Sequence, residues 1–127
     1  MFLGVGSGTL WRAPLPQVLA LYVIGLFVNG LPEELFFRGF LLPRLEALLG
    51  NTLHALVLSA WFFNAIHIPI ELANGASWPV ALAQVFSIGF PSGLLWGYVY
   101  LRVRSIVPGV FWHTAQMNLG YLLVSFN

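Results

Sequence analysis

The chain has 127 residues, of which 59% are hydrophobic and only 7% are charged, whereas charged residues make up about 25% of a typical globular protein. So few charges cannot cover the surface of a water-soluble fold, so the expected solvent is the lipid bilayer. A net charge of +1 without any lysine argues against nucleic acid as a partner, and the absence of cysteine excludes disulfides and thiolate metal sites.

The first segment, residues 1–16, predicts an irregular or interfacial lead-in because it is rich in glycine and proline and holds a Trp11-Arg12 pair. Residues 17–127 predict a single transmembrane helical core. This core begins with an apolar helix from Gln17 to Leu31, which is short for a complete membrane crossing.

A proline marks one boundary of each of the next two predicted helices. Pro32 suits the first turn of a helix and predicts the start of a second helix that runs to about Leu49. Gly50-Asn51 is expected to close that helix. A third apolar helix follows over residues 52–70, and Pro69 is expected to end it.

Residues 71–77 form a polar loop around Asn74-Gly75. Trp78 to Leu101 is then free of charge and long enough for a full crossing. Its glycines recur every four residues and form a smooth ridge for close helix packing, and Pro91 is expected to bend it. A last span follows over residues 105–126. The glycines are Gly89, Gly93 and Gly97.

These elements predict an all-α fold, a polytopic membrane helix bundle of about four to five helices with a polar site inside the membrane. Most of the arginines fall on one membrane face if the helices alternate in direction, with Glu71 on the other. Cytoplasmic loops carry an excess of basic residues, so the arginine face is expected to be cytoplasmic. These arginines are Arg12, Arg44, Arg102 and Arg104.

Two of the four acidic residues stand side by side, Glu33 and Glu34, inside an almost purely apolar run. Charges in such a run are costly and are usually kept for function. Glu34 and Arg38 share a helix face and are expected to pair. Glu33 points about 100° away, so it is free to act as a general base. The alternative is a structural ion-pair cluster that holds helices together.

Two histidines can be placed by depth. Glu33 lies about 17 residues before the turn at 50–51 and His67 about 16 residues after it, so two antiparallel helices would bring both to one level, about 25 Å from the turn. His113 lies only about 12 Å beyond Ser105. For His113 to meet Glu33, the last helix must tilt or the turn at 102–108 must dip inward. Alternatively, His67 caps a helix end.

The ordered pieces Glu33-Glu34-x-x-x-Arg38, Phe63-x-x-x-His67 and a histidine in the last helix followed by an amide resemble the CAAX protease and bacteriocin-processing (CPBP, or Abi) family. The flanking segments 37–42, 97–102 and 105–108 are similar to the family as well. The resemblance covers about residues 25–122, which is most of the chain.

The resemblance implies an intramembrane endopeptidase, of the type II CAAX prenyl protease kind, that acts on a membrane-anchored peptide or protein. Glu33 would be the general base that activates water with help from His67. Glu34 and Arg38 would orient the site, and His113 with a nearby amide would stabilise the oxyanion. Amide hydrolysis needs both an activated water and donors aimed at the developing charge.

The last motif departs from the family pattern, which usually reads His-x-x-x-Asn. The fourth residue after His113 is Met117, and Asn118 is the fifth, about 100° from the expected helix face. Gln116 lies nearer to the face of His113 and could supply the amide, or a local bulge could return Asn118 to register. Family members usually carry more helices upstream, so the chain resembles a minimal member or a fragment.

Two other functions stay open on these residues. One is a catalytically inactive relative that serves in bacteriocin immunity or as a binding partner. The other is a small transporter or ion-binding bundle, because acids and histidines also line proton paths. Glu33, His67 and His113 could also ligate zinc with an open position, although we favour a metal-free site without a cofactor. The expected location is a bacterial or archaeal cell membrane, as a multi-pass integral protein.

Overall fold

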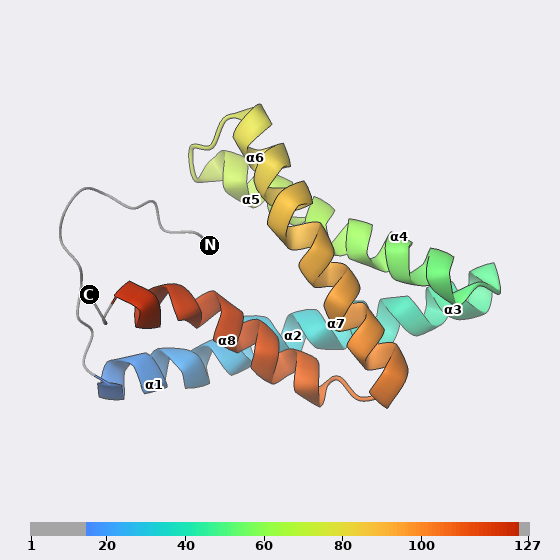
Figure 1. The fold of residues 1–127 in the computed structure, drawn as a ribbon, viewed down its shortest axis with the longest axis horizontal. Coiled ribbons are helices and arrows are strands. Elements are labelled where there is room, and N and C mark those ends of the chain that lie inside the picture. Colours follow the sequence, from blue (N-terminus) through green and yellow to red (C-terminus); the bar gives the residue numbers. More distant parts are fainter. Residues whose placement is uncertain (1–14, 125–127) are drawn as a thin grey trace.

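The computed structural model describes residues 15–124, with side chains over residues 15–116. Helices are the only regular secondary structure in this described part, which contains no strand. It consists of four long helices, Leu15–Leu49, Thr52–Ala73, Trp78–Val103 and Val107–Val124 (Figure 1). The first three are long and apolar enough to cross a membrane. The predicted all-α membrane bundle is therefore confirmed. The lead-in predicted over residues 1–16 lies almost wholly outside the described residues.

The first helix runs without interruption from Leu15 to Leu49, so the prediction that Pro32 begins a separate helix is wrong. Its 35 residues alternate between α-helical and π-helical turns. The segments are α1 (Leu15–Gly25), η1 (Leu26–Gly30), α2 (Leu31–Glu34), η2 (Leu35–Leu41) and α3 (Leu42–Leu49).

The π-helical turns explain why proline does not end these helices. Three π-helical turns each end two residues before a proline. The residue between the turn and the proline donates its N–H to the carbonyl five positions back. Such widened turns re-satisfy the backbone around a proline in lipid. The prolines are Pro32, Pro43 and Pro91, and the bonds run from Leu31 to Leu26, from Leu42 to Phe37 and from Phe90 to Val85.

The second helix likewise continues past the proline expected to end it. It consists of α4 (Thr52–Ala65) and α5 (His67–Ala73), with a turn at Ile66 between them. Pro69 is the third residue of α5. N–H groups in a first helical turn have no intrahelical partner in any case, so proline is tolerated there. Asn51 caps α4 by accepting a bond from the His54 N–H at 2.9 Å.

The third helix consists of α6 (Trp78–Gln84), η3 (Val85–Gly89) and α7 (Phe90–Val103). The predicted glycine ridge packs α7 against α4. A Cβ at Gly93 would lie 3.3 Å from the Ala60 Cβ, and a Cβ at Gly89 or Gly97 would collide with the α4 side chains opposite. Side chains on the ridge would thus force the two helices apart.

The last helix, α8 (Val107–Val124), returns along the first helix (Figure 1). The turn that precedes it lies well inside the end of the bundle, because Ile106 is at the level of Gly39, about ten residues before the end of the first helix. At 1.5 Å per residue this is about 15 Å. Arg104 also reaches Glu46 of α3, with Nη1 2.9 Å from Oε2. The turn therefore dips inward, as His113 requires.

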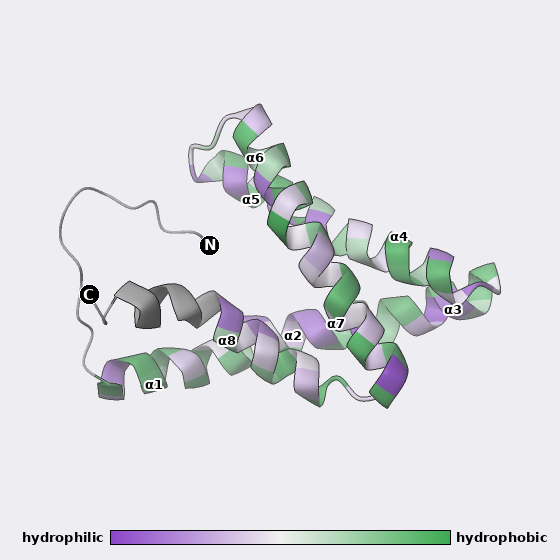
Figure 2. Ribbon diagram, in the orientation of Figure 1, coloured by the Kyte–Doolittle hydropathy of each residue, from purple (hydrophilic) through white to green (hydrophobic). Residues whose placement is uncertain are grey.

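Hydrophobic residues make up much of each helix, whereas hydrophilic residues stand at α2 in the middle of the first helix (Figure 2). Large apolar side chains such as Phe27 and Leu48 are 66% and 80% exposed. Such a surface is stable in lipid and not in water. The buried core instead centres on Phe37, Phe63 and Trp96.

The arrangement predicts a definite membrane topology. The chain has no native cysteine, so single cysteines can be labelled cleanly at Asn51 and Ser77, which are both exposed at opposite ends of the second helix. We expect an impermeant maleimide to label Ser77→Cys in intact cells, and Asn51→Cys only after permeabilisation, because the turn at 50–51 lies at the arginine-rich end.

The cysteine-free parent is the control for this labelling experiment. Labelling of both positions from the same side would contradict a membrane crossing by Thr52–Ala73.

Candidate active site

An ion pair is buried in the middle of the first helix. Glu34 in α2 and Arg38 in η2 are each 1% exposed, and the Arg38 Nη1 donates to the Glu34 Oε1 at 2.9 Å. Arg38 Nη2 also donates to the Gly93 carbonyl of α7 at 3.3 Å. The guanidinium carbon lies 4.4 Å from the ring centre of Phe63. The predicted Glu34–Arg38 pair is thus present, and it links the first helix to α4 and α7.

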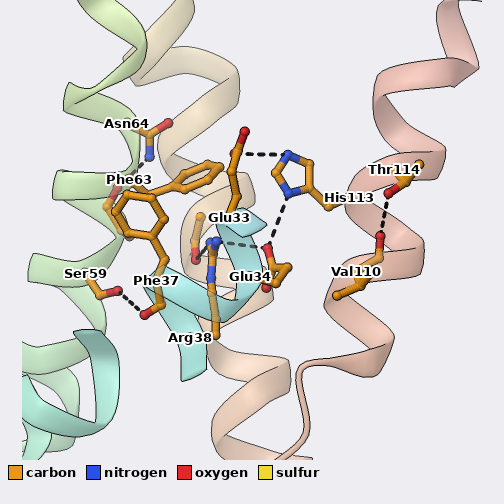
Figure 3. Close-up of polar contacts among 12 residues, drawn as sticks. Glu33, Glu34, Phe37, Arg38, Ser59, Phe63, Asn64, Val110, His113 and Thr114 are labelled. Carbon is orange, nitrogen blue, oxygen red and sulfur yellow. Dashed lines mark hydrogen bonds and ion pairs between the residues drawn. The ribbon is translucent and has the colours of Figure 1, made fainter. Parts of the chain in front are cut away.

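His113 of α8 lies between the two glutamates (Figure 3). Its Nδ1 is 3.4 Å from Glu34 Oε1, and its Nε2 is 3.7 Å from Glu33 Oε2. Trp96 of α7 stacks on the imidazole, with ring centres 4.3 Å apart and an interplanar angle of 29°. Phe63 meets the same ring edge-on at 5.7 Å. The imidazole is thus held by charge on two sides and by aromatic rings on its faces and edge.

Two glycines allow α8 to pack closely against the first helix. A Cβ at Gly109 would lie 2.5 Å from Oε2 of Glu34, and a Cβ at Gly30 would collide with Thr114. Thr114 is fully buried, and its hydroxyl donates to the carbonyl of Val110 at 2.8 Å. Larger side chains at either glycine would push His113 away from the carboxylates.

His67, the first residue of α5, approaches the same oxygen of Glu33. The His67 Nδ1 is 2.8 Å from the Phe63 carbonyl, which can only accept, so Nδ1 carries a proton and donates. Neutral His67 therefore keeps Nε2 unprotonated, and this atom lies 4.0 Å from Glu33 Oε2. The depth match predicted for Glu33 and His67 is present, although Pro69 does not end the helix.

Glu33 is therefore the centre of the cluster. Its side chain is 25% exposed, compared with 1% for Glu34. Its buried Oε2 makes no hydrogen bond to any side chain or backbone group of the described residues. The distances of 3.7 Å and 4.0 Å to the two imidazoles are longer than a direct hydrogen bond and suit a group held between them. Glu34 is paired with Arg38, whereas no arginine of the described residues pairs with Glu33.

Of the two predicted amides, only that of Gln116 belongs to a described side chain. The Gln116 Nε2 donates to the Ser92 hydroxyl of α7 at 3.3 Å, so its amide nitrogen is engaged between α7 and α8, one helical turn from His113. The side chains of Met117 and Asn118 lie outside the described residues.

Sequence reasoning did not single out Trp96, which stacks on His113. Trp96 is only 6% exposed. The available signal was its position between Gly93 and Gly97, which brings its helix close to its neighbours. Gly109 gave no signal because a glycine near the start of a helix has many explanations.

A metal centre is the remaining possibility raised by these side chains. Ligands around one zinc ion lie about 2.0–2.2 Å from it. The described residues contain no group of three histidine or acidic side chains arranged to hold an ion.

Together, the apolar helices and the carboxylate–histidine cluster between them define an all-α membrane bundle with a polar site among its helices. A family model described as "Type II CAAX prenyl endopeptidase Rce1-like" matches residues 15–118. The chain therefore belongs to the Rce1-like family of type II CAAX prenyl endopeptidases. This confirms the resemblance to CAAX proteases.

A curated relative is the uncharacterized protein YyaK of Bacillus subtilis (strain 168), which is 32% identical over 100 residues. The match covers 78% of this chain and 31% of YyaK, so the chain spans about a third of the length of that relative. No solved structure matches the chain.

Proposed function

We propose that this protein is an intramembrane endopeptidase that cleaves a peptide bond in a membrane-anchored protein or peptide. A prenylated, CAAX-type substrate is the first candidate, because the family to which the chain belongs is that of type II CAAX prenyl endopeptidases. The observation that carries the proposal is that the partly exposed Glu33 faces both His67 and His113 across distances of 4.0 Å and 3.7 Å.

In the proposed reaction, Glu33 accepts a proton from a water held beside Oε2, and the hydroxide attacks the carbonyl carbon of the scissile bond. His67 Nε2 lies on the same side and orients that water. The proton on Glu33 then passes to the leaving amine, so the bond to nitrogen breaks with no net change in the enzyme.

His113 is proposed to stabilise the oxyanion that forms in the attack. With Nδ1 directed at Glu34, a protonated His113 presents Nε2–H toward the Glu33 side of the site. A donor aimed at developing charge in a site shielded from water is worth about 3–4 kcal/mol. Asn118 remains the proposed second donor, with Gln116 as the alternative.

The proposed location is a bacterial or archaeal cell membrane, with the protein inserted as a multi-pass integral protein in contact with lipid. Three helices of suitable length and the Bacillus relative support this placement. The domain division proposed is a lead-in over 1–16 and one helical core over 17–127.

A second candidate function is a catalytically inactive member that acts in bacteriocin immunity or as a binding partner. The bond between Gln116 and Ser92 favours it, because this amide nitrogen does not point at the carboxylate–histidine cluster. In that case the cluster would hold the helices together and would not hydrolyse peptides.

The direct test uses purified protein in proteoliposomes and a quenched fluorescent peptide that carries a farnesylated cysteine. We expect cleavage at one bond, identified by the mass of the products, and an unchanged rate after treatment with a chelator. Loss of activity on chelation with recovery on adding zinc would refute the metal-free site. Absence of any cleavage, with protection of cells against a bacteriocin, would favour the second candidate.

A further inference from the structure

Four buried side-chain atoms in the described residues lack a hydrogen-bond partner. Two of them, on Glu33 and His113, belong to the carboxylate–histidine cluster. The other two, Gln84 Oε1 and Trp96 Nε1, lie on the third helix and have no part in the proposed reaction. Burying a polar atom without a partner is costly, most of all in lipid, and each case calls for an explanation.

Gln84 and Trp96, which carry these two atoms, lie on one ridge of the third helix together with Ile88 and Ser92. Twelve residues of uninterrupted α-helix would place Gln84 and Trp96 about 120° apart around the axis. The π-helical turn η3 lies between them and takes up one additional residue, which reduces the offset to about 20°. The π turn therefore places Gln84 and Trp96 on one face, about 18 Å apart along the helix.

Ser92 lies between them on the same ridge and carries a further polar group. Its hydroxyl donates to the carbonyl of Ile88 at 2.8 Å and accepts from Gln116 of α8 at 3.3 Å. Ile88, the remaining member of the ridge, is 46% exposed, so no described helix covers this part of the face. α6 and α8 also diverge away from the turn that joins α7 to α8 (Figure 1).

The ridge is continuous with the carboxylate–histidine cluster, because Trp96 stacks directly on His113. A ligand on the ridge would thus enter the cluster at one end. An unpaired acceptor and an unpaired donor match the N–H and C=O groups of a peptide backbone, which must also find partners inside a membrane. An extended chain advances about 3.3 Å per residue, so 18 Å corresponds to about five or six residues.

We infer that the ridge formed by Gln84, Ile88, Ser92 and Trp96 binds the main chain of the substrate in extended form, on one side of the scissile bond. The inference rests on the proposed function and deepens it. Recognition through the backbone makes binding depend on the length of the peptide on that side and only weakly on its side chains, as in other cases of strand-like peptide recognition.

The test measures binding separately from hydrolysis. A fluorescent, farnesylated peptide long enough to span the ridge is titrated into protein in nanodiscs, with Glu33→Gln present so that bound peptide is not consumed. We expect Gln84→Met to raise the Kd about five- to tenfold, as for the loss of one hydrogen bond. The matched control is Ser87→Ala, since Ser87 lies on the same helix and bonds to the carbonyl of Ala83 but is exposed.

Thermal stability separates a binding role from a structural one. Methionine has nearly the shape of glutamine and removes an unpaired buried acceptor, so Gln84→Met should melt at the same temperature as the parent or higher. A structural role for Gln84 predicts lower stability and weaker binding together, and that outcome would overturn the inference. Unchanged Kd in Gln84→Met would overturn it as well.

A backbone-modified peptide series locates the contact. Methylation of a single backbone nitrogen should weaken binding at one position about five or six residues from the scissile bond, and Gln84→Met should remove that sensitivity. Equal sensitivity in both proteins would contradict a contact at Gln84. If Gln84→Met weakens peptide binding but no Glu33-dependent cleavage is found, the inferred binding ridge is supported and the proposed hydrolysis is contradicted. If cleavage depends on Glu33 but binding does not depend on Gln84, only the inferred ridge is contradicted.

Discussion

Glu33→Gln is expected to abolish peptide hydrolysis by a correctly folded protein. Glutamine keeps the shape of the side chain but cannot accept a proton from water, and general-base catalysis contributes about 10²–10⁴-fold to a rate. Because Glu33 makes no short hydrogen bond to the described residues through Oε2, the change should cost little stability. The measurement is the initial rate on the farnesylated peptide in proteoliposomes, with thermal unfolding alongside.

Glu46→Gln is the matched control for that experiment. Glu46 pairs with Arg104 near the surface, far along the first helix from the carboxylate–histidine cluster, so its replacement should leave kcat unchanged. Retention of the parental rate in Glu33→Gln would contradict the proposal that Glu33 is the general base. Retention of bacteriocin protection by the same variant would instead support the binding or immunity role.

Arg38→Met is expected to produce the largest loss of stability among single substitutions at the site. It leaves Glu34 in a dry environment without its partner at 2.9 Å. Removal of one member of a buried ion pair typically costs about 3–5 kcal/mol, because the remaining charge is uncompensated. The measurement is unfolding in detergent micelles, followed by heat or by denaturant.

The double variant Glu34→Gln with Arg38→Met should recover much of that loss, since the orphaned charge is then gone. Arg44→Met is the control. Arg44 is exposed and lies over the ring of Phe40, with 3.7 Å from the guanidinium carbon to the ring centre. Such an exposed contact is worth about 0.5–1 kcal/mol. Equal effects of Arg38→Met and Arg44→Met would mean that the buried pair does not stabilise the fold.

Local spacing was sufficient to predict part of the site. Glu34 and Arg38 pair because residues four apart on a helix are neighbours whatever surrounds them. Glu33 and His67 meet because two helices joined by a short turn keep equal depths at equal distances from it. Both conclusions depend only on helix geometry near the residues concerned, and the structure agrees with both.

Proline was the main source of error, at Pro32 and at Pro69. A missing N–H has two outcomes in a membrane helix, termination or absorption by a widened turn, and the local sequence does not distinguish them. The structure has a π-helical turn before Pro32, and Pro69 lies in the first turn of α5. The same turns shift side-chain register, which is why the alignment of Gln84 with Trp96 could not be predicted.

The sequence by itself determined the solvent, the helical class and the chemistry available, because composition, spacing and the scarcity of charge act locally along the chain. Only the tertiary structure decided how His113 reaches Glu33. That contact depends on an inward turn before α8 and on the close approach allowed by Gly109 and Gly30. It also decided that Trp96 lies against His113. Such contacts join residues far apart in the chain, and their distances follow from how whole helices pack.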